Sequence, residues 1–244
     1  MTRGFHWLKL KQKDKLPRAT GVYAFDNARG KHLYIGKSKD IKRRVRDHFQ
    51  KTGYRDKLFV NQVEKIGYFQ TPSEVEALIL EAQLIKNHQP KYNVIWKDGK
   101  NYYWVSFSRE HFSRVRLTHQ KTEDSEYLGP FVDGRALKMT LALLRGIFPY
   151  LTKKHPKNPC HDCEIGLCPG PNPNLQKYRQ NIKNLKKVLL GQRGGLINGL
   201  RRKMKASSRQ NDFERAAAWR DQIRALEKIF DHQTPTARDL LLKI

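Results

Sequence analysis

The sequence predicts an α+β protein, with a small mixed or antiparallel sheet flanked by helices, then a cysteine-containing loop and helical region, then a helical hairpin. Two observations support this prediction. In the first hundred residues, short β-branched and aromatic runs alternate with stretches of helical periodicity. Near the C-terminal end, apolar residues recur at spacings of three and four, which is typical of packed helices. A chain of 244 residues is long enough for one or two packed domains.

The first elements are a predicted hairpin, a helix and a third strand. Residues 20–25 and 32–36 are rich in β-branched and aromatic side chains and are separated by turn residues, so they predict two paired strands. Residues 40–50 carry apolar side chains at helical spacing, and Asp40 is placed to cap that helix. Residues 63–70 predict the third strand.

The next helix has the clearest start signal in the chain. Thr71 is followed by Pro72 and, three residues on, by Glu74, which predicts a capping box with proline at the first helical position. An apolar stripe follows, and Pro90 ends the helix. Further along, the sequence predicts a strand over 101–108, an apolar helix over 136–148, a proline-rich loop over 153–174 and a helical hairpin over 196–230.

The charge balance is strongly basic and narrows the class of partner. Lysine and arginine number 49 against 23 acidic residues, a formal net charge of +26. Such a chain favours a polyanion, with nucleic acid ahead of an anionic membrane. No apolar run reaches the length of about 18 residues that a membrane span needs, and the first ten residues show no secretory signal. The 3 cysteines are clustered rather than spread in a disulfide framework, which indicates a reducing compartment.

Glu81 is the most informative residue of the helix that follows Thr71. A carboxylate on an apolar helix face is costly unless it is paired, neutralised or bound to a cation. Two interpretations therefore stand, a salt bridge to a nearby arginine and a metal ligand. The helical neighbours of Glu81 three and four positions away are all apolar: Ala77, Leu78, Leu84 and Ile85.

Tyr23 and Tyr34 fall on the two paired strands, and basic residues crowd the sequence around and after them. Tyrosines on strands are usually packing residues, and a basic run is usually a solvated helix face. Charge at this density is nevertheless costly through self-repulsion, and phosphate relieves it. The basic residues of this stretch are Lys31, Lys37, Lys39, Lys42, Arg43, Arg44 and Arg46.

These residues carry a resemblance to a known family. The signature of the GIY-YIG nuclease superfamily is matched by Gly21-Val22-Tyr23 and Tyr34-Ile35-Gly36. The N-terminal half of the bacterial excinuclease UvrC, and its shorter relative Cho, are similar to the segments YIGKSKDIKRRVRDHF, EVEALILEAQLIKNHQPKYNVIWKDGKNYYWVSF, YLGPF and LLRGIFP. The UVR motif, which binds the helicase-like protein UvrB, resembles NDFERAAAWRDQIRALEKI. The resemblance spans about residues 17–231.

The resemblance implies a metal-dependent DNA endonuclease site. Tyr23 and Tyr34 would face the scissile phosphate, one of them taking the proton of the attacking water. Lys37 and Arg44 would bind phosphate oxygens, and we expect their charge, with the metal, to favour the phenolate form of a tyrosine. Glu81 would hold a single Mg²⁺ or Mn²⁺ ion, since hard cations prefer oxygen ligands.

Further positions complete the implied site. Asn93, in a family Tyr-Asn pair with Tyr92, would orient the site. His48 stands where UvrC proteins often have tyrosine and many other family members have histidine, and it would bind phosphate or relay a proton. Contacts to the DNA are expected from Lys39, Lys42, Arg43 and Arg46.

The cysteines form a second candidate metal site. The spacing of Cys160, Cys163 and Cys168 suits zinc or an iron–sulfur cluster, with His161 as a fourth ligand. The UvrC family often has four cysteines in this region, whereas Asn172 stands here in place of the last. Two interpretations are open, a three-cysteine metal site and a metal-free vestigial loop.

The hairpin predicts a protein partner. Its apolar seam offers more surface than about 35 residues can bury internally, so we expect it to pack against a helical hairpin of UvrB. The residues expected to bind UvrB are Phe213, Ala216, Trp219, Ile223 and Phe230.

The predicted organisation is a GIY-YIG domain over 1–100, a UvrC-type linker and cysteine region over 101–190, a UVR-like hairpin over 191–232 and a tail over 233–244. The resemblance implies one incision 3′ to a lesion in a complex of UvrB with damaged double-stranded DNA, during nucleotide excision repair. It also implies a bacterial, cytoplasmic protein that is monomeric on its own and binds no membrane. It fits both an N-terminal part of UvrC and a stand-alone Cho-like protein. The alternatives are a non-catalytic basic adaptor for UvrB and DNA, and a mobile-element or structure-selective GIY-YIG nuclease.

Overall fold

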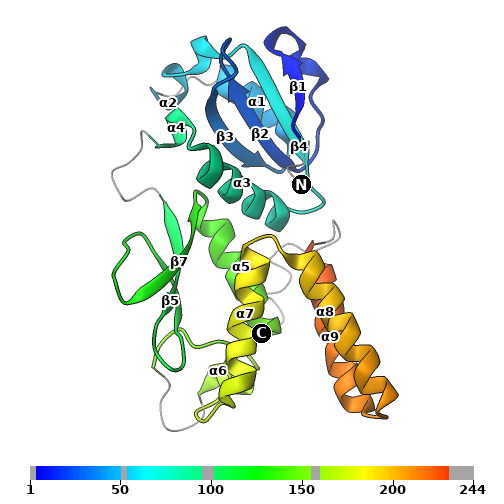
Figure 1. Ribbon diagram of the computed structural model, residues 1–244. Helices are drawn as coiled ribbons and strands as arrows, with labels where there is room; N and C mark the ends of the chain where they lie inside the picture. Colours follow the sequence, from blue (N-terminus) through cyan, green and yellow to red (C-terminus); the bar gives the residue numbers. More distant parts are fainter. Residues whose placement is uncertain (1–3, 51–53, 95–101, 155–159, 231–244) are drawn as a thin grey trace. The chain divides into compact units, whose positions relative to one another are not determined.

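The computed structural model describes residues 4–50, 54–94, 102–154 and 160–230. The chain divides into two compact units (Figure 1). The first consists of Met1–Tyr102 with Gly129–Asp133, and the second of Tyr103–Leu128 with Gly134–Ile244. The expected tail over 233–244 and the expected strand start at Asn101 lie outside the described residues. Within the described ranges, no helix combines the length and the apolar character that crossing a bilayer requires.

The first unit is built on a four-stranded sheet in the order β1-β4-β2-β3, with every neighbouring pair antiparallel. The strands expected near 20–25, 32–36 and 63–70 are confirmed, whereas β1 was not expected. Strand β3 lies at an edge of the sheet. The elements are β1 (His6–Lys9), β2 (Gly21–Asp26), β3 (His32–Ser38), α1 (Ile41–Gln50), α2 (Tyr54–Lys57), β4 (Lys65–Gln70), α3 (Glu74–His88) and α4 (Lys91–Val94), with short 3-10 helices at Leu10–Lys15 and Val60–Gln62.

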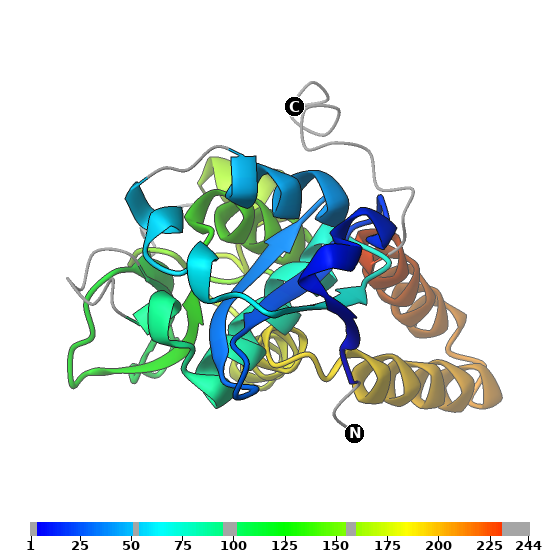
Figure 2. The same cartoon turned by 90° about the horizontal axis from the view of Figure 1, so that it is seen from above.

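Both faces of this sheet are covered, which explains why every residue of β2 is buried. Tyr23 and Phe25 point to the face where α1 packs, whereas Val22 and Ala24 join the core on the α3 side. This division follows from the strand geometry, because successive side chains point to opposite faces. Figure 2 shows α1, in blue, beside the strands of this sheet.

Helices α1 and α3 each begin at a residue whose side chain caps the first turn. Asp40 caps α1 as expected, since its Oδ1 accepts a hydrogen bond from the N–H of Arg43 at 2.9 Å. The expected capping box of α3 is wrong by two residues. Ser73, not Thr71, is the N-cap, and its hydroxyl accepts a hydrogen bond from the N–H of Glu76 at 3.2 Å. The Thr71 hydroxyl instead donates to the Ser73 carbonyl, so Ser73 and Glu76 form the Ser-x-x-Glu pattern that starts the helix.

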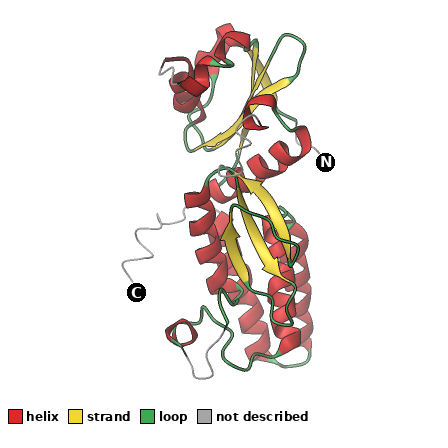
Figure 3. Cartoon of the chain, turned by 90° about the vertical axis from the view of Figure 1, so that its left-hand side faces the viewer, coloured by secondary structure: helices red, strands yellow, loops and turns green. Residues whose placement is uncertain are grey.

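The second unit combines a three-stranded sheet, in the order β6-β5-β7, with long helices (Figure 3). Helices α8 and α9 pack along each other as a hairpin. Helix α7 was not expected from the sequence; its start is capped by Asn174, whose Oδ1 accepts from the N–H of Lys177 at 2.9 Å. The elements are β5 (Tyr103–Ser108), β6 (Val115–Thr118), β7 (Ser125–Phe131), α5 (Gly134–Ile147), α6 (His161–Glu164), α7 (Leu175–Leu189), α8 (Arg193–Arg209) and α9 (Phe213–Phe230).

Candidate active site and binding surfaces

The edge strand β3 is completed by side chains rather than by another strand. The N–H of Ile35 donates to Asn93 Oδ1, and Asn93 Nδ2 donates to the Ile35 carbonyl, both at 2.8 Å. Two residues further along, the N–H of Lys37 donates to Glu81 Oε1 at 2.8 Å. An unpaired edge leaves backbone groups open for pairing with another chain. Asn93 and Glu81 therefore close this edge, and they are held in place by it.

Glu81 is buried, with only 4% of its surface exposed. One of its two carboxylate oxygens, Oε1, has a hydrogen-bond partner in the N–H of Lys37. Its Oε2 is buried and has no hydrogen-bond partner within the described residues. Burial raises the pKa of Glu81 to about 7, although the charge and the backbone N–H of Lys37 lower it. Among the described residues no arginine forms a salt bridge with Glu81, so that interpretation does not hold there. A buried oxygen that lacks a donor is suited to a cation ligand.

The two signature tyrosines lie together over the glycine of β3. Tyr23 is opposite Gly36 in the strand register, and its ring centroid lies 6.2 Å from that of Tyr34. A Cβ on Gly36 would come within 2.6 Å of the Tyr23 hydroxyl, so only glycine leaves room for this phenol. Tyr34 also stacks on Phe59: the ring centroids lie 5.3 Å apart and the ring planes differ by 5°.

The expectation that nearby positive charge favours a phenolate holds in direction for Arg44, but burial opposes it more strongly. Burial raises the pKa of Tyr23 well above its usual value, and Tyr34 raises it further. Burial also raises the pKa of Tyr34 to about 12, with the Glu81 carboxylate adding to the rise. Arg44 lowers both pKa values, but burial outweighs it. Both phenols are therefore protonated near neutral pH.

His48 contacts the Tyr23 phenol, a contact that the sequence did not predict. The Tyr23 hydroxyl lies 2.7 Å from His48 Nε2 in a buried contact. His48 Nδ1 lies 2.6 Å from Asp56 Oδ1. Sequence reasoning did not single out Asp56. It stands eight residues beyond His48, a separation that corresponds to no helix or strand neighbour, and α2 carries it back to the site.

The Lys37 ammonium is engaged within the protein. Its Nζ forms an ion pair with Asp133 Oδ2 at 2.8 Å, and only 14% of the Lys37 side chain is exposed. Asp133 belongs to the segment Gly129–Asp133 that clusters with the first unit. A phosphate at this lysine would therefore have to compete with a carboxylate already in place. Sequence reasoning missed Asp133 because it lies far from Lys37 along the chain.

The residues expected to bind DNA lie on and just before α1. Arg43, Arg44 and Arg46 are exposed there. Lys39 is also exposed, and its Nζ lies 2.6 Å from Glu74 Oε1. Lys42 is half-buried and donates to a backbone carbonyl. The three arginines and Lys39 therefore carry the exposed charge of this set.

The cysteines converge as their spacing predicted. The three sulfur atoms lie within 4.8 Å of one another. Cys163 Sγ is 3.3 Å from Cys160 Sγ and 3.4 Å from Cys168 Sγ. The expected fourth ligand is not part of this cluster, because His161 is exposed and its Nδ1 lies 3.7 Å from Glu164. Structural zinc sites almost always have four ligands, and within the described residues this cluster supplies three.

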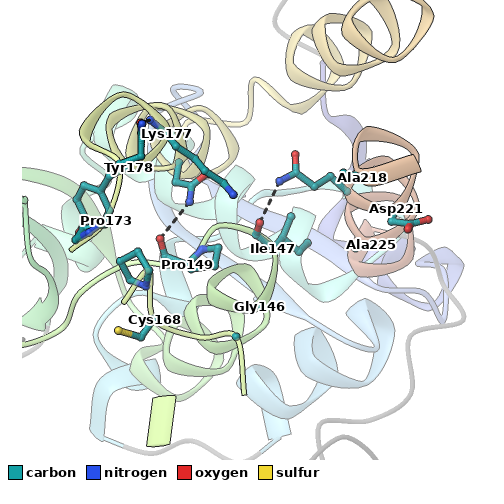
Figure 4. Close-up of a pocket in the computed structure, with 15 residues that line it drawn as sticks. Gly146, Ile147, Pro149, Cys168, Pro173, Lys177, Tyr178, Ala218, Asp221 and Ala225 are labelled. Carbon is teal, nitrogen blue, oxygen red and sulfur yellow. Dashed lines mark hydrogen bonds between the residues drawn. The ribbon is translucent and has the colours of Figure 1, made fainter. Parts of the chain in front are cut away.

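A cavity of about 560 Å³ adjoins this cysteine cluster (Figure 4). Cys168 lies at its wall, with residues of α5, α7 and α9 around it. Asn181 Nδ2 donates to the Pro149 carbonyl at 3.3 Å, and Gln222 Nε2 donates to the Ile147 carbonyl at 3.5 Å (Figure 4). These bonds join α7 and α9 to the end of α5.

The helical hairpin keeps only part of its apolar seam on the surface. Phe213 is 66% exposed, and Ala216 and Trp219 are half-buried. The expectation of a wholly exposed seam is wrong for Ile223 and Phe230, which are 6% and 2% exposed and belong to the core of the unit. At the tip of the hairpin, a hollow of about 810 Å³ is lined by Met204, Arg209, Phe213, Ala216 and neighbouring residues.

Comparison with known proteins gives matches in both units. Residues 19–94 match the family model described as the UvrC-like GIY-YIG domain. Residues 194–229 match the model of the UvrB/uvrC motif. The first match covers both tyrosines, His48, Glu81 and Asn93, so the site described above lies in a GIY-YIG domain.

The relatives define the family more narrowly. The UvrABC system protein C of Moorella thermoacetica is 37% identical over 230 residues, which cover 90% of this chain and 38% of that protein. The protein of the same name from Methanosarcina acetivorans is 37% identical over 226 residues, covering 90% of this chain and 44% of that protein. The chain belongs to the UvrC family and spans less than half the length of these relatives.

A solved structure is also similar. It is the GIY-YIG N-terminal endonuclease domain of UvrC from Thermotoga maritima, bound to its catalytic divalent cation, magnesium. The sequences are 36% identical, the match covers 34% of this chain and 93% of that chain, and the TM-score is 0.33.

Proposed function

We propose that this chain is a metal-dependent DNA endonuclease of nucleotide excision repair. It makes the incision 3′ to a lesion in a complex of UvrB with damaged double-stranded DNA. The observation that carries the proposal is Glu81 Oε2, a buried carboxylate oxygen without a hydrogen-bond partner within the described residues. It lies in a site with the buried Tyr23, the half-buried Tyr34 and the charge of Arg44. The names of the relatives support this proposal.

The donor set of the site fits one Mg²⁺ or Mn²⁺ ion. A single carboxylate would leave such a hard cation mostly hydrated, with room for phosphate oxygens. When bound, the ion supplies charge stabilisation at the phosphate. The chain's own contribution is orientation, because the N–H of Lys37 holds Oε1 and leaves Oε2 for the cation. Zinc or an iron–sulfur cluster at the three cysteines stays a separate prediction.

The other side chains bind, orient and move protons. Arg44 is exposed and acts on both phenols, so it can also reach a phosphate that lies over them. Tyr23 and Tyr34 exclude water from the sheet and present hydroxyl groups. Asn93 holds β3 in register at Ile35, which positions the site without touching the reacting atoms.

The partners follow from charge and from the hairpin. A net charge of +26 favours the DNA backbone, and we assign the exposed arginines of α1 and Lys39 and Lys42 to it. We assign UvrB to the hairpin surface around Phe213, with Ala216 and Trp219, while Ile223 and Phe230 support that surface from inside. We expect the protein to be monomeric on its own and to act in the cytoplasm, where the chromosome is.

One assay separates this proposal from its alternatives. The substrate is a duplex with a single fluorescein-modified thymine, incubated with UvrB and Mg²⁺. A nick 3′ to the modified base that requires both UvrB and Mg²⁺ supports the proposal. UvrB binding without nicking would indicate an adaptor, and nicking without UvrB or without regard to the lesion would indicate a structure-selective nuclease.

A further inference from the structure

The active site contains a chain of two hydrogen bonds that no sequence motif predicts. It runs from Tyr23 on β2 through His48 in the last turn of α1 to Asp56 in α2, with contacts of 2.7 and 2.6 Å. The imidazole is 4% exposed and the Asp56 side chain 21% exposed. Three elements thus bring a phenol, an imidazole and a carboxylate into successive hydrogen-bond contact.

The carboxylate decides which nitrogen of His48 carries the proton. An ionised carboxylate only accepts hydrogen bonds, so the hydrogen of the His48–Asp56 contact belongs to Nδ1. Burial lowers the pKa of His48, and Arg44 lowers it further, while Asp56 and Asp47 raise it. The imidazole is therefore neutral near pH 7, and its Nε2 is an acceptor. Tyr23 must then donate its hydroxyl hydrogen to Nε2.

This arrangement distinguishes the two tyrosines. A phenolate at Tyr23 is costly because the side chain is buried, so its proton can leave only to a base already within hydrogen-bond distance. His48 is that base. The Tyr34 ring lies 5.5 Å from the imidazole, but the hydrogen bond to Nε2 comes from Tyr23.

We propose that Asp56 is a positioning residue that holds His48 as the Nδ1–H tautomer, so that His48 Nε2 accepts the Tyr23 proton during phosphodiester hydrolysis. This inference rests on the proposed endonuclease function. As the water oxygen bonds to phosphorus, one water proton passes to the Tyr23 oxygen and the Tyr23 proton passes to Nε2. The phosphorus bond to the leaving sugar oxygen breaks, and that oxygen takes a proton from solvent.

The charge that develops on His48 has a defined partner. The imidazolium formed by the transfer keeps its Nδ1–H on the Asp56 carboxylate, which stabilises it, and later releases the Nε2 proton to solvent. The ionisable groups that face the imidazole from the surrounding elements are Tyr23, Tyr34, Arg44, Asp47 and Asp56.

The position of Asp56 is secured by the segment that carries it. Phe59, two residues after α2, is 3% exposed and packs against Tyr34, Phe25 and Tyr92 in the core. A short helix anchored in this way can present a carboxylate at a fixed place, which a freely moving loop cannot.

The first test reads the tautomer directly, in the full chain labelled with ¹⁵N-histidine. The wild-type spectrum should show His48 protonated at Nδ1 and not at Nε2, with the signals assigned by their loss in His48→Gln. Asp56→Asn should populate the Nε2–H tautomer, because the amide can donate to Nδ1, and Asp56→Glu should restore the Nδ1–H form. Asp47→Asn removes a neighbouring carboxylate that does not contact Nδ1, and it should leave the tautomer unchanged. An Nε2–H tautomer in the wild type, or no change in Asp56→Asn, overturns the proposal.

The second test measures single-turnover nicking of the fluorescein-modified duplex at saturating DNA, UvrB and Mg²⁺. Asp56→Asn should lower the rate about 100-fold or more with unchanged DNA affinity, which is the usual range for lost acid–base assistance. Asp56→Glu should recover part of the rate, and Asp47→Asn should stay within about twofold of wild type. A wild-type rate in Asp56→Asn overturns the proposal. If the wild type does not nick while the tautomer shifts as expected, the endonuclease proposal fails and the positioning of His48 by Asp56 stands.

Discussion

Replacing Glu81 by glutamine tests whether the buried carboxylate binds a cation. Glutamine keeps the shape of the side chain and the oxygen that accepts from the N–H of Lys37. It removes the ionised form, which burial disfavours so strongly that the pKa rises from 4.5 to about 7. One pKa unit is worth about 1.4 kcal/mol, so the ionised carboxylate costs the folded protein about 3 kcal/mol when no cation is bound.

The sign of the pH dependence follows from the direction of this shift. The folded state holds the Glu81 proton more tightly than the unfolded state, so this contribution to stability is fully present below pH 4.5 and is lost as pH rises through about 7. At about pH 5, wild type and Glu81→Gln should be similar in stability. At about pH 8, Glu81→Gln should be more stable by about 2 kcal/mol, because the new buried amide offsets about 1 kcal/mol of the gain.

The assay is urea unfolding in EDTA and in Mg²⁺, read by hydrogen exchange of peptides from β2 and β3 so that the first unit is followed by itself. Mg²⁺ should stabilise wild type at about pH 8 and leave Glu81→Gln unchanged, and nicking by Glu81→Gln should fall by orders of magnitude. The control is Glu74→Gln on the same helix, a half-buried residue paired with Lys39, for which we expect less than about 1 kcal/mol. A Glu81→Gln protein that is destabilised equally at both pH values, or that still responds to Mg²⁺ and nicks DNA, would show that Glu81 is only structural.

Three other changes give expected outcomes. Asn93→Ala removes both hydrogen bonds to Ile35 and should lower the unfolding free energy by about 2–3 kcal/mol in urea, because it leaves backbone groups unsatisfied. Phe213→Ala should weaken UvrB binding by at least about tenfold in calorimetry and leave the melting temperature unchanged, since Phe213 is exposed. Anaerobically purified protein should contain about one zinc per chain, or show thiolate-to-iron absorbance, and Cys163→Ser should lose it, because Cys163 contacts both other sulfur atoms.

Each of these has a matched control. Asn87→Ala changes an exposed asparagine of α3 and should stay within about 0.5 kcal/mol of wild type, so a loss as large as that of Asn93→Ala would contradict the hydrogen-bond account. Met139→Ala changes another exposed apolar residue away from the hairpin and should leave UvrB binding intact. His161→Ala should retain the metal, because His161 lies outside the cysteine cluster. Metal-free protein with an unchanged melting temperature in Cys163→Ser would indicate the vestigial loop.

Local signals in the sequence predicted the strands and helices that carry the tyrosines and Glu81. The spacing of apolar side chains predicted the bounds of β2, β3, α1 and α3 to within a few residues. This was possible because these elements pack on both faces of one sheet and so carry apolar side chains at regular intervals. Helix α7 was missed, since its N-cap Asn174 follows a run of prolines that indicated only loop. The cap of α3 was misplaced because Thr71 and Ser73 both start a capping pattern, and only the folded backbone selects one.

The residues that complete the site were beyond sequence reasoning for a different reason. Asp56 and Asp133 contact His48 and Lys37 through the fold and not through any regular spacing. The pKa values of the tyrosines could not be predicted from the sequence either. They are raised because the side chains are buried, which a count of nearby basic residues does not reveal. The seam of the hairpin also read as one surface, although Ile223 and Phe230 face the interior.

The closure of β3 by Glu81 and Asn93 has a consequence for how such sites are inherited. Both side chains hold the edge of the sheet as well as serving the candidate active site. Selection for folding alone would preserve Asn93, whereas at position 81 it would favour glutamine, which keeps the bond to Lys37 without the cost of a buried charge. A descendant that lost its nuclease activity would therefore keep the asparagine and lose the carboxylate. In comparisons among relatives, an intact asparagine is poor evidence of catalysis. The carboxylate of Glu81, the hydroxyls of Tyr23 and Tyr34 and the guanidinium of Arg44 are better evidence.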